Sequence, residues 1–277
     1  MDPLVIPIAA GVLLAGLLAG WVLLRSWRPK PGAHPPAVVP AGWRSLIEER
    51  VPLTRRLTDL EWNRLLGLVS GFVREKNFEG IDGLDVTEEM KVIVAAQACL
   101  LLLHLDIGPF PAVRSVILYP GTFVPKVPGM DRHMGVDPEY ETVPTLGESL
   151  RGAIVLSWEN VLQSVARPGD GRNVVLHEFA HQLDQEDGYV DGIPLLEAPS
   201  STRVWARVIR ERFEELRKKT LDGESDLLSA YGATNRAEFF SVATESFFER
   251  PVELRERYPD LYRELKGFYR QDPAERV

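Results

Sequence analysis

The chain has 277 residues, of which 45% are hydrophobic and 26% are charged, so it can bury the core of one sizeable domain or two small ones. Its formal net charge of −8 argues against nucleic acid or another polyanion as a partner. Cys99 is the only cysteine, which excludes a disulfide framework, and its apolar surroundings predict a small buried hydrophobe.

The first element is an uncharged, apolar run from Leu4 to Leu24. At about 1.5 Å per residue, a helix of this length can cross the ~30 Å hydrocarbon core of a bilayer. Asp2 is the only charged side chain before the run, whereas residues 25–30 carry three positive charges, the opposite of the order in a cleavable signal peptide. We therefore predict a single-pass membrane anchor over residues 1–27, in the inner membrane, with the rest of the chain in the cytoplasm.

A proline-rich stretch, PKPGAHPPAVVP, occupies residues 29–40 and favours an extended, stiff spacer. We expect a linker over residues 28–41 and a folded domain over residues 42–277. His34 has no ligand-type neighbours in the spacer, so we expect it to be solvated.

The first half of this domain shows helix and strand patterns without metal-ligand spacing. Thr58 and Glu61 have the spacing of a capping box, and His104 ends an apolar run as an expected helix-end histidine. A substrate chain could pair with residues 152–158 if that strand lies at a sheet edge. The patterns predict helices at 43–50, 58–75, 90–105 and 205–219, and strands at 113–119 and 152–158.

The segment from Asn173 to Asp187, NVVLHEFAHQLDQED, is expected to be a helix and contains a complete H-E-x-x-H motif. His177 and His181 lie four residues apart on one helical face, so both imidazoles can bind a single ion. Glu178 lies about 100° round the helix, where it can take a proton from metal-bound water. Apolar flanks predict burial, and buried imidazoles beside a carboxylate are costly without a partner. We predict one Zn²⁺ per chain.

A catalytic zinc site needs a third protein ligand. One known solution is H-E-x-x-H-x-x-G-x-x-H, but this chain has Asp184 and Asp187 in place of the glycine and the last histidine. Asp187 stays open as an oxygen ligand, although an unbroken helix would carry it past the ion.

The sequence SAYGATNRAEFFSVATE offers a better third ligand. Thr234 or Asn235 can cap a helix on which Glu238 and Glu245, seven residues apart, share a face. Glutamates in so apolar a helix require a partner, and a Zn²⁺ bound by the two histidines is one. Tyr231 lies in the turn before this helix and can donate a hydrogen bond to a developing oxyanion.

The blocks HEFAHQLD, SAYGATNRAEFF and FFERP together resemble the Mlc titration factor A family of bacterial zinc peptidases. They are similar, more distantly, to the metalloprotease domain of anthrax lethal factor. The resemblance implies a zincin-like, mostly helical α+β domain with a small sheet. It also implies the following roles: His177, His181 and Glu238 as zinc ligands, Glu178 as general base, and Tyr231 as transition-state stabiliser.

Two further acidic residues lie close to this ligand set. Glu245 matches a glutamate of the family pattern and is expected to orient a ligand histidine. Asp184, on the same helical face as the histidines, is expected either to do the same or to be exposed at the surface.

The motif and the resemblance predict a membrane-anchored zinc metallopeptidase that hydrolyses peptide or protein substrates, with aminopeptidase-like cleavage. The alternative is a regulatory module that sequesters a transcriptional repressor such as Mlc, with structural or regulatory zinc. Glu178 favours catalysis, because a purely structural site needs no carboxylate between its histidines. The predicted anchor departs from the best-known family members, which are soluble and cytoplasmic.

Overall fold

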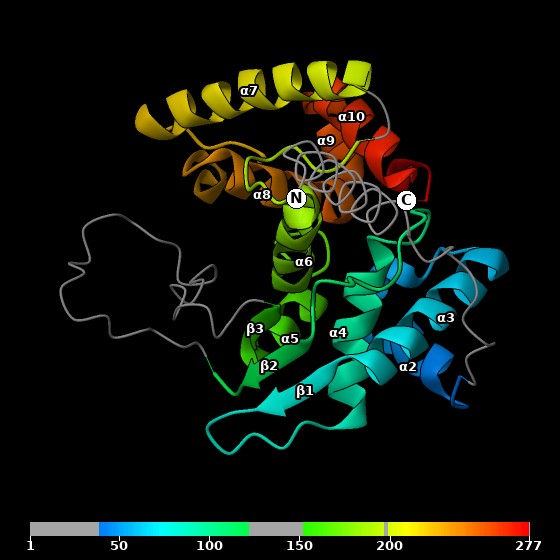
Figure 1. Cartoon of the computed structure of the whole chain (residues 1–277). Coiled ribbons are helices and arrows are strands. Elements are labelled where there is room, and N and C mark those ends of the chain that lie inside the picture. The colour runs from blue at the N-terminus through cyan, green and yellow to red at the C-terminus, as the bar shows by residue number, and fades with distance from the viewer. Residues whose placement is uncertain (1–38, 122–151, 197–198, 277) are drawn as a thin grey trace, which may run out of the picture. The chain divides into compact units, whose positions relative to one another are not determined.

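The structure, a computed structural model, describes residues 39–121, 152–196 and 199–276 (Figure 1). The predicted anchor, most of the predicted linker and His34 lie outside these ranges, and the domain boundaries stay predictions. Within the described ranges, no helix combines the length and the apolar character needed to span a membrane.

The described part of the chain is mostly helical, with a small sheet, as predicted. The helices are α2 (Trp43–Arg50), α3 (Asp59–Glu75), α4 (Glu88–Leu100), α5 (Trp158–Ala166), α6 (Val174–Asp184), α7 (Pro199–Leu221), α8 (Arg236–Glu249), α9 (Pro251–Arg257) and α10 (Pro259–Tyr269). The 3-10 turns are η1 (Pro52–Thr54), η4 (Gln185–Asp187), η5 (Ala230–Ala233) and η6 (Pro273–Glu275). The strands are β1 (Asn77–Gly80), β2 (Ser115–Tyr119) and β3 (Ala153–Ser157).

The three strands form a parallel sheet in the order β1-β2-β3. Val116 of β2 pairs with Phe78 on one side and with Ile154 on the other. The side chains of Val116 and Ile154 are buried, so this row of the sheet faces the core. Within the described residues β3 is an edge strand, which is the condition that pairing with a substrate chain requires.

Capping explains where the early helices begin. The Thr58 hydroxyl accepts a hydrogen bond from the Glu61 amide, and the Glu61 carboxylate accepts one from the Thr58 amide at 2.9 Å. This capping box confirms the predicted start of α3. His104 Nε2 lies 3.0 Å from Glu61 Oε1, so this histidine has a side-chain partner on α3.

Helix α6 lies between the small sheet with α4 on one side and the C-terminal helices, including α8, on the other (Figure 1). Phe179 anchors α6 in the core, with its ring centroid 4.6 Å from that of Phe110 and 5.6 Å from that of Phe72. A fully buried phenylalanine contributes about 3–5 kcal/mol relative to alanine, so this contact fixes the position of α6. Helix α8 packs along α6 and is buried over most of its length.

Candidate metal centre

The H-E-x-x-H motif lies on α6, whose start is set by Asn173. The Asn173 side-chain oxygen accepts a hydrogen bond from the Leu176 amide at 3.0 Å, as an N-cap should. The α-helix ends at Asp184 and continues as the turn η4, so the prediction of one helix through Asp187 was wrong at its end. Gly188, with φ +93°, closes that turn in the left-handed conformation. The Asp187 side chain is outside the described part of the structure.

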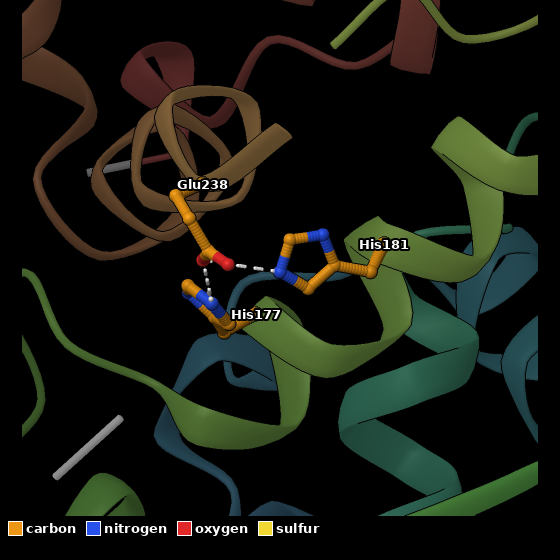
Figure 2. A group of neighbouring side chains, drawn as sticks. All are labelled: His177, His181 and Glu238. Atoms are coloured by element: carbon orange, nitrogen blue, oxygen red, sulfur yellow. Dashed lines mark hydrogen bonds and ion pairs between the residues drawn. The ribbon is translucent and has the colours of Figure 1, made fainter. Parts of the chain in front are cut away.

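Three candidate ligands come together between α6 and α8 (Figure 2). The Glu238 atom Oε2 lies 3.0 Å from His177 Nε2 and 3.2 Å from His181 Nε2. One donor atom from each residue falls within 4.8 Å of the others. Ligand atoms at the corners of a tetrahedral zinc site are about 3.3 Å apart, so the separations of Glu238 Oε2 from the two imidazole nitrogens fit that geometry. Two imidazoles and a carboxylate are also a donor set that zinc accepts.

The three candidate ligands differ in their exposure. The His177 side chain is fully buried, whereas the side chains of His181 and Glu238 are 10% and 13% exposed. The centre therefore has a protected side at His177 and an accessible side at His181 and Glu238. An accessible side is what a catalytic site needs for water and substrate.

Glu245 contacts the buried His177 imidazole at Nδ1, the ring nitrogen that does not face Glu238. Its Oε1 lies 2.8 Å from His177 Nδ1, and its Oε2 accepts a hydrogen bond from the Asn173 amide. Burial opposes the charged imidazole, but hydrogen bonds with Glu238 and Glu245 outweigh it and raise the pKa of His177 to about 10. The contact of Nδ1 with Glu245 leaves the other ring nitrogen, Nε2, facing Glu238 at the ligand position.

Glu178 and Tyr231 also lie at the centre. Glu178 is half-buried, and its burial raises the pKa of the carboxyl, while the charges of His177 and His181 oppose the rise. The Tyr231 ring lies in η5, with its centroid 5.8 Å from that of His177. Both side chains are thus placed beside the imidazoles from different elements.

Asp184 ends α6, and its expected role in orienting a ligand histidine stays a prediction. It is fully buried, so the surface-exposure alternative was wrong. Its Oδ2 accepts a hydrogen bond from the Gly192 amide at 3.0 Å, which ties it to the loop after η4.

A polar network at the start of α6 was not predicted from the sequence. Asn173 Nδ2 donates to Gln97 Oε1 at 2.9 Å and to Glu249 Oε1 at 3.0 Å, linking α6 to α4 and α8. Two signals in the sequence point to it: Gln97 is a lone polar residue in the apolar stretch 92–103, and Glu249 follows Glu245 by one turn. This network supports the position of His177 through Asn173 and Glu245.

Comparison with known proteins assigns the chain to a family. A family model described as glucose-regulated metallo-peptidase M90 matches residues 24–270. The chain belongs to the M90 family. This membership confirms the predicted resemblance to Mlc titration factor A, and it indicates a metallopeptidase, for which the His-His-Glu group is a fitting metal site.

Individual relatives align over most of the chain. An uncharacterized protein from Synechocystis is 32% identical over 267 residues, 94% of this chain and 95% of its own length. The Mlc titration factor A of Pectobacterium atrosepticum is 32% identical over 238 residues, 85% of this chain and 88% of its own length. The Mlc titration factor A of Yersinia pestis is 29% identical over 246 residues, with 88% and 89% covered. The likeness to anthrax lethal factor stays a prediction.

Proposed function

We propose that the chain is a zinc-dependent peptidase of the gluzincin type, with His177, His181 and Glu238 as ligands of one Zn²⁺. The observation that carries the proposal is the convergence of three donor atoms from α6 and α8 within 4.8 Å. Glu238 lies 61 positions after His177 and 57 after His181 in the sequence, so it is the fold that brings its carboxylate to the two imidazoles. Membership of a metallopeptidase family supports the same conclusion.

When bound, Zn²⁺ would lower the pKa of water and polarise the scissile carbonyl. Glu178 accepts the proton of the attacking water and returns it to the leaving amine, a role suited to a carboxyl whose pKa is raised by burial. Tyr231 donates a hydrogen bond to the oxygen on which negative charge develops. Glu245 keeps the His177 ring oriented throughout, because both of its oxygens are held.

Two variants test this proposal directly. Glu178→Gln should retain zinc, because Glu178 is not a ligand, but should lose peptide hydrolysis by at least ~100-fold. Glu238→Gln should lower zinc content as well as activity. The control is Glu48→Gln, which makes the same charge change at an exposed site on α2. Zinc is measured by elemental analysis and hydrolysis with a peptide library. Full activity in Glu178→Gln would remove the proposed base.

A second candidate function follows from the names of two relatives. Each is called Mlc titration factor A, which suggests that this chain also binds a transcriptional repressor of the Mlc kind. If repressor binding were the only function, Glu178→Gln would bind the repressor as the wild type does, and neither protein would hydrolyse peptides. Hydrolysis that depends on Glu178 would instead support the peptidase.

We propose further that residues 1–27 anchor the domain in the inner membrane and leave it in the cytoplasm. The support is the uncharged run from Leu4 to Leu24 and the positive charges that follow it.

We also propose an aminopeptidase-like preference for short peptides. Digestion of a peptide set with free and blocked N-termini tests it, since equal cleavage of both would contradict the preference.

A further inference from the structure

Gly192 lies buried where the loop after η4 meets two helices. Its amide donates a hydrogen bond to Asp184 Oδ2 on α6 at 3.0 Å. Its carbonyl accepts one from Trp205 Nε1 on α7 at 2.9 Å. Asp184 and Trp205 are 0% and 1% exposed, so the Gly192 backbone is held on two sides by buried groups.

A third contact places Gly192 against the start of α8. A Cβ atom built on Gly192 would lie 2.4 Å from the Arg236 carbonyl oxygen, well inside the 3.0 Å that real Cβ contacts essentially never breach. Gly192 also has φ +76°, a left-handed conformation that suits glycine. The close approach is to backbone, which cannot swing aside as a side-chain tip can.

These contacts join the two helices that carry the candidate ligands. Asp184 follows His181 by three residues, and Arg236 precedes Glu238 by two. Gly192 therefore fills the space between the end of α6 and the start of α8. Any atom added at Gly192 pushes on the first residue of α8, one helical turn or less from the Glu238 carboxylate.

We propose that Gly192 is a positioning residue, which sets the separation of α6 and α8 and thereby the distance of Glu238 from the two histidines. The proposal rests on the metal function proposed above. Metal–ligand distances vary by only about 0.2 Å in working sites. Relieving the contact at Gly192 requires a displacement of at least about 0.6 Å, the difference between 3.0 and 2.4 Å. Asp184 and Trp205 hold the glycine in place, so part of this displacement falls on α8.

The test compares Gly192→Ala with Gly188→Ala in the full-length chain in detergent. Gly188 has φ +93° and no atom within 4 Å of a built Cβ, so its variant has the same backbone strain without the clash. The dissociation constant for zinc is measured by competition with a chromophoric chelator and corrected for the folded fraction. Gly192→Ala should bind zinc at least 10-fold more weakly, as variants of residues that support metal ligands do, whereas Gly188→Ala should stay within about 3-fold of the wild type. Equal affinity of Gly192→Ala and the wild type overturns the proposal, even if the variant melts at a lower temperature.

Trp205→Phe keeps the test decisive if Gly192→Ala does not fold. It removes the indole N–H that holds the Gly192 carbonyl and keeps an aromatic ring beside Phe240. It should weaken zinc binding by about 3-fold or more, and unchanged affinity would overturn the proposal.

Glu238→Gln separates the proposed metal site from the proposed role of Gly192. If it binds zinc as the wild type does, the proposed metal site fails and the role of Gly192 fails with it. If only the Gly192 and Trp205 variants bind normally, the role of Gly192 fails alone.

Discussion

Glu249→Gln tests the buried network at the start of α6. The Glu249 side chain is 7% exposed and accepts hydrogen bonds from the Gly169 amide at 2.8 Å and from Asn173 Nδ2 at 3.0 Å. Burial raises the pKa of Glu249 to about 7, although both donors oppose the rise. Glutamine has the shape of the protonated acid and does not titrate, so the substitution removes the titration while changing little volume.

The sign and size of the effect follow from this pKa. Between the unfolded value of 4.5 and the folded value of about 7, the folded chain holds a proton that the unfolded chain has released. The free energy of unfolding therefore falls by about 1.4 kcal/mol per pH unit in this window. The contribution of Glu249 is complete below pH 4.5 and is lost as the pH rises through about 7. The total loss is about 3 kcal/mol.

The assay is urea unfolding at pH 5 and pH 8, in the presence of a chelator so that zinc binding does not add its own pH dependence. The stability of Glu249→Gln relative to the wild type should rise by about 2.5 kcal/mol from pH 5 to pH 8, because part of the total loss has already occurred at pH 5. Glu48→Gln, an exposed control, should show no such rise. The reasoning is refuted if the difference between Glu249→Gln and the wild type is the same at both pH values.

Three further predictions concern the centre and the anchor. Glu245→Gln should weaken zinc binding by about 10- to 100-fold because it loosens the His177 ring, and chelator competition measures this; wild-type affinity would contradict the role of Glu245. Tyr231→Phe should lower kcat by about 100-fold with KM nearly unchanged, and an effect on KM alone in steady-state kinetics would contradict transition-state stabilisation. If residues 1–27 anchor the domain in the cytoplasm, protease added to intact cells should leave the domain uncut, and its digestion from outside would overturn that topology.

The helices that begin with a local signal could be predicted from the sequence. Thr58 and Glu61 form the expected capping box, and α3 ends at Glu75 as predicted. Asn235 caps α8, one of the two caps proposed for it. These signals act within one helical turn, so they do not depend on the rest of the fold.

Elements that depend on distant partners were missed or given wrong ends. Strand β1, with the sequence NFEG, has no alternating pattern, and its amide at Asn77 pairs with the Arg114 carbonyl at 2.9 Å, far along the chain. Helix α4 was predicted to reach Leu105 but ends at Leu100. The Leu100 carbonyl accepts a hydrogen bond from Gln271 near the C-terminus at 2.9 Å. Propensity within the apolar run cannot reveal such a partner.

The residues of the candidate site also fall into two groups, those that the sequence predicted and those that only the fold reveals. Its proposed chemical residues were found because catalysis requires particular residue types at particular spacings, as in H-E-x-x-H. The residues that hold them, such as Asn173 and Gly192, are of common types and belong to no motif. Their roles follow from contacts between α4, α6, α7 and α8, which only the folded chain brings together.

Three glutamates on α8 link the candidate metal centre to the residues that hold it in place. Glu238, Glu245 and Glu249 follow one another at intervals of seven and four residues, so they line one face of α8, the face that meets α6. The first contacts both imidazoles, the second contacts one imidazole and the cap of α6, and the third contacts that cap and the Gly169 amide. A change at the third glutamate therefore reaches the metal centre through the register of the two helices. The proposed role of Gly192 is to set the separation of the same two helices at the opposite end of the interface, near Glu238. Contacts at both ends of one helix pair thus hold the candidate ligands in place.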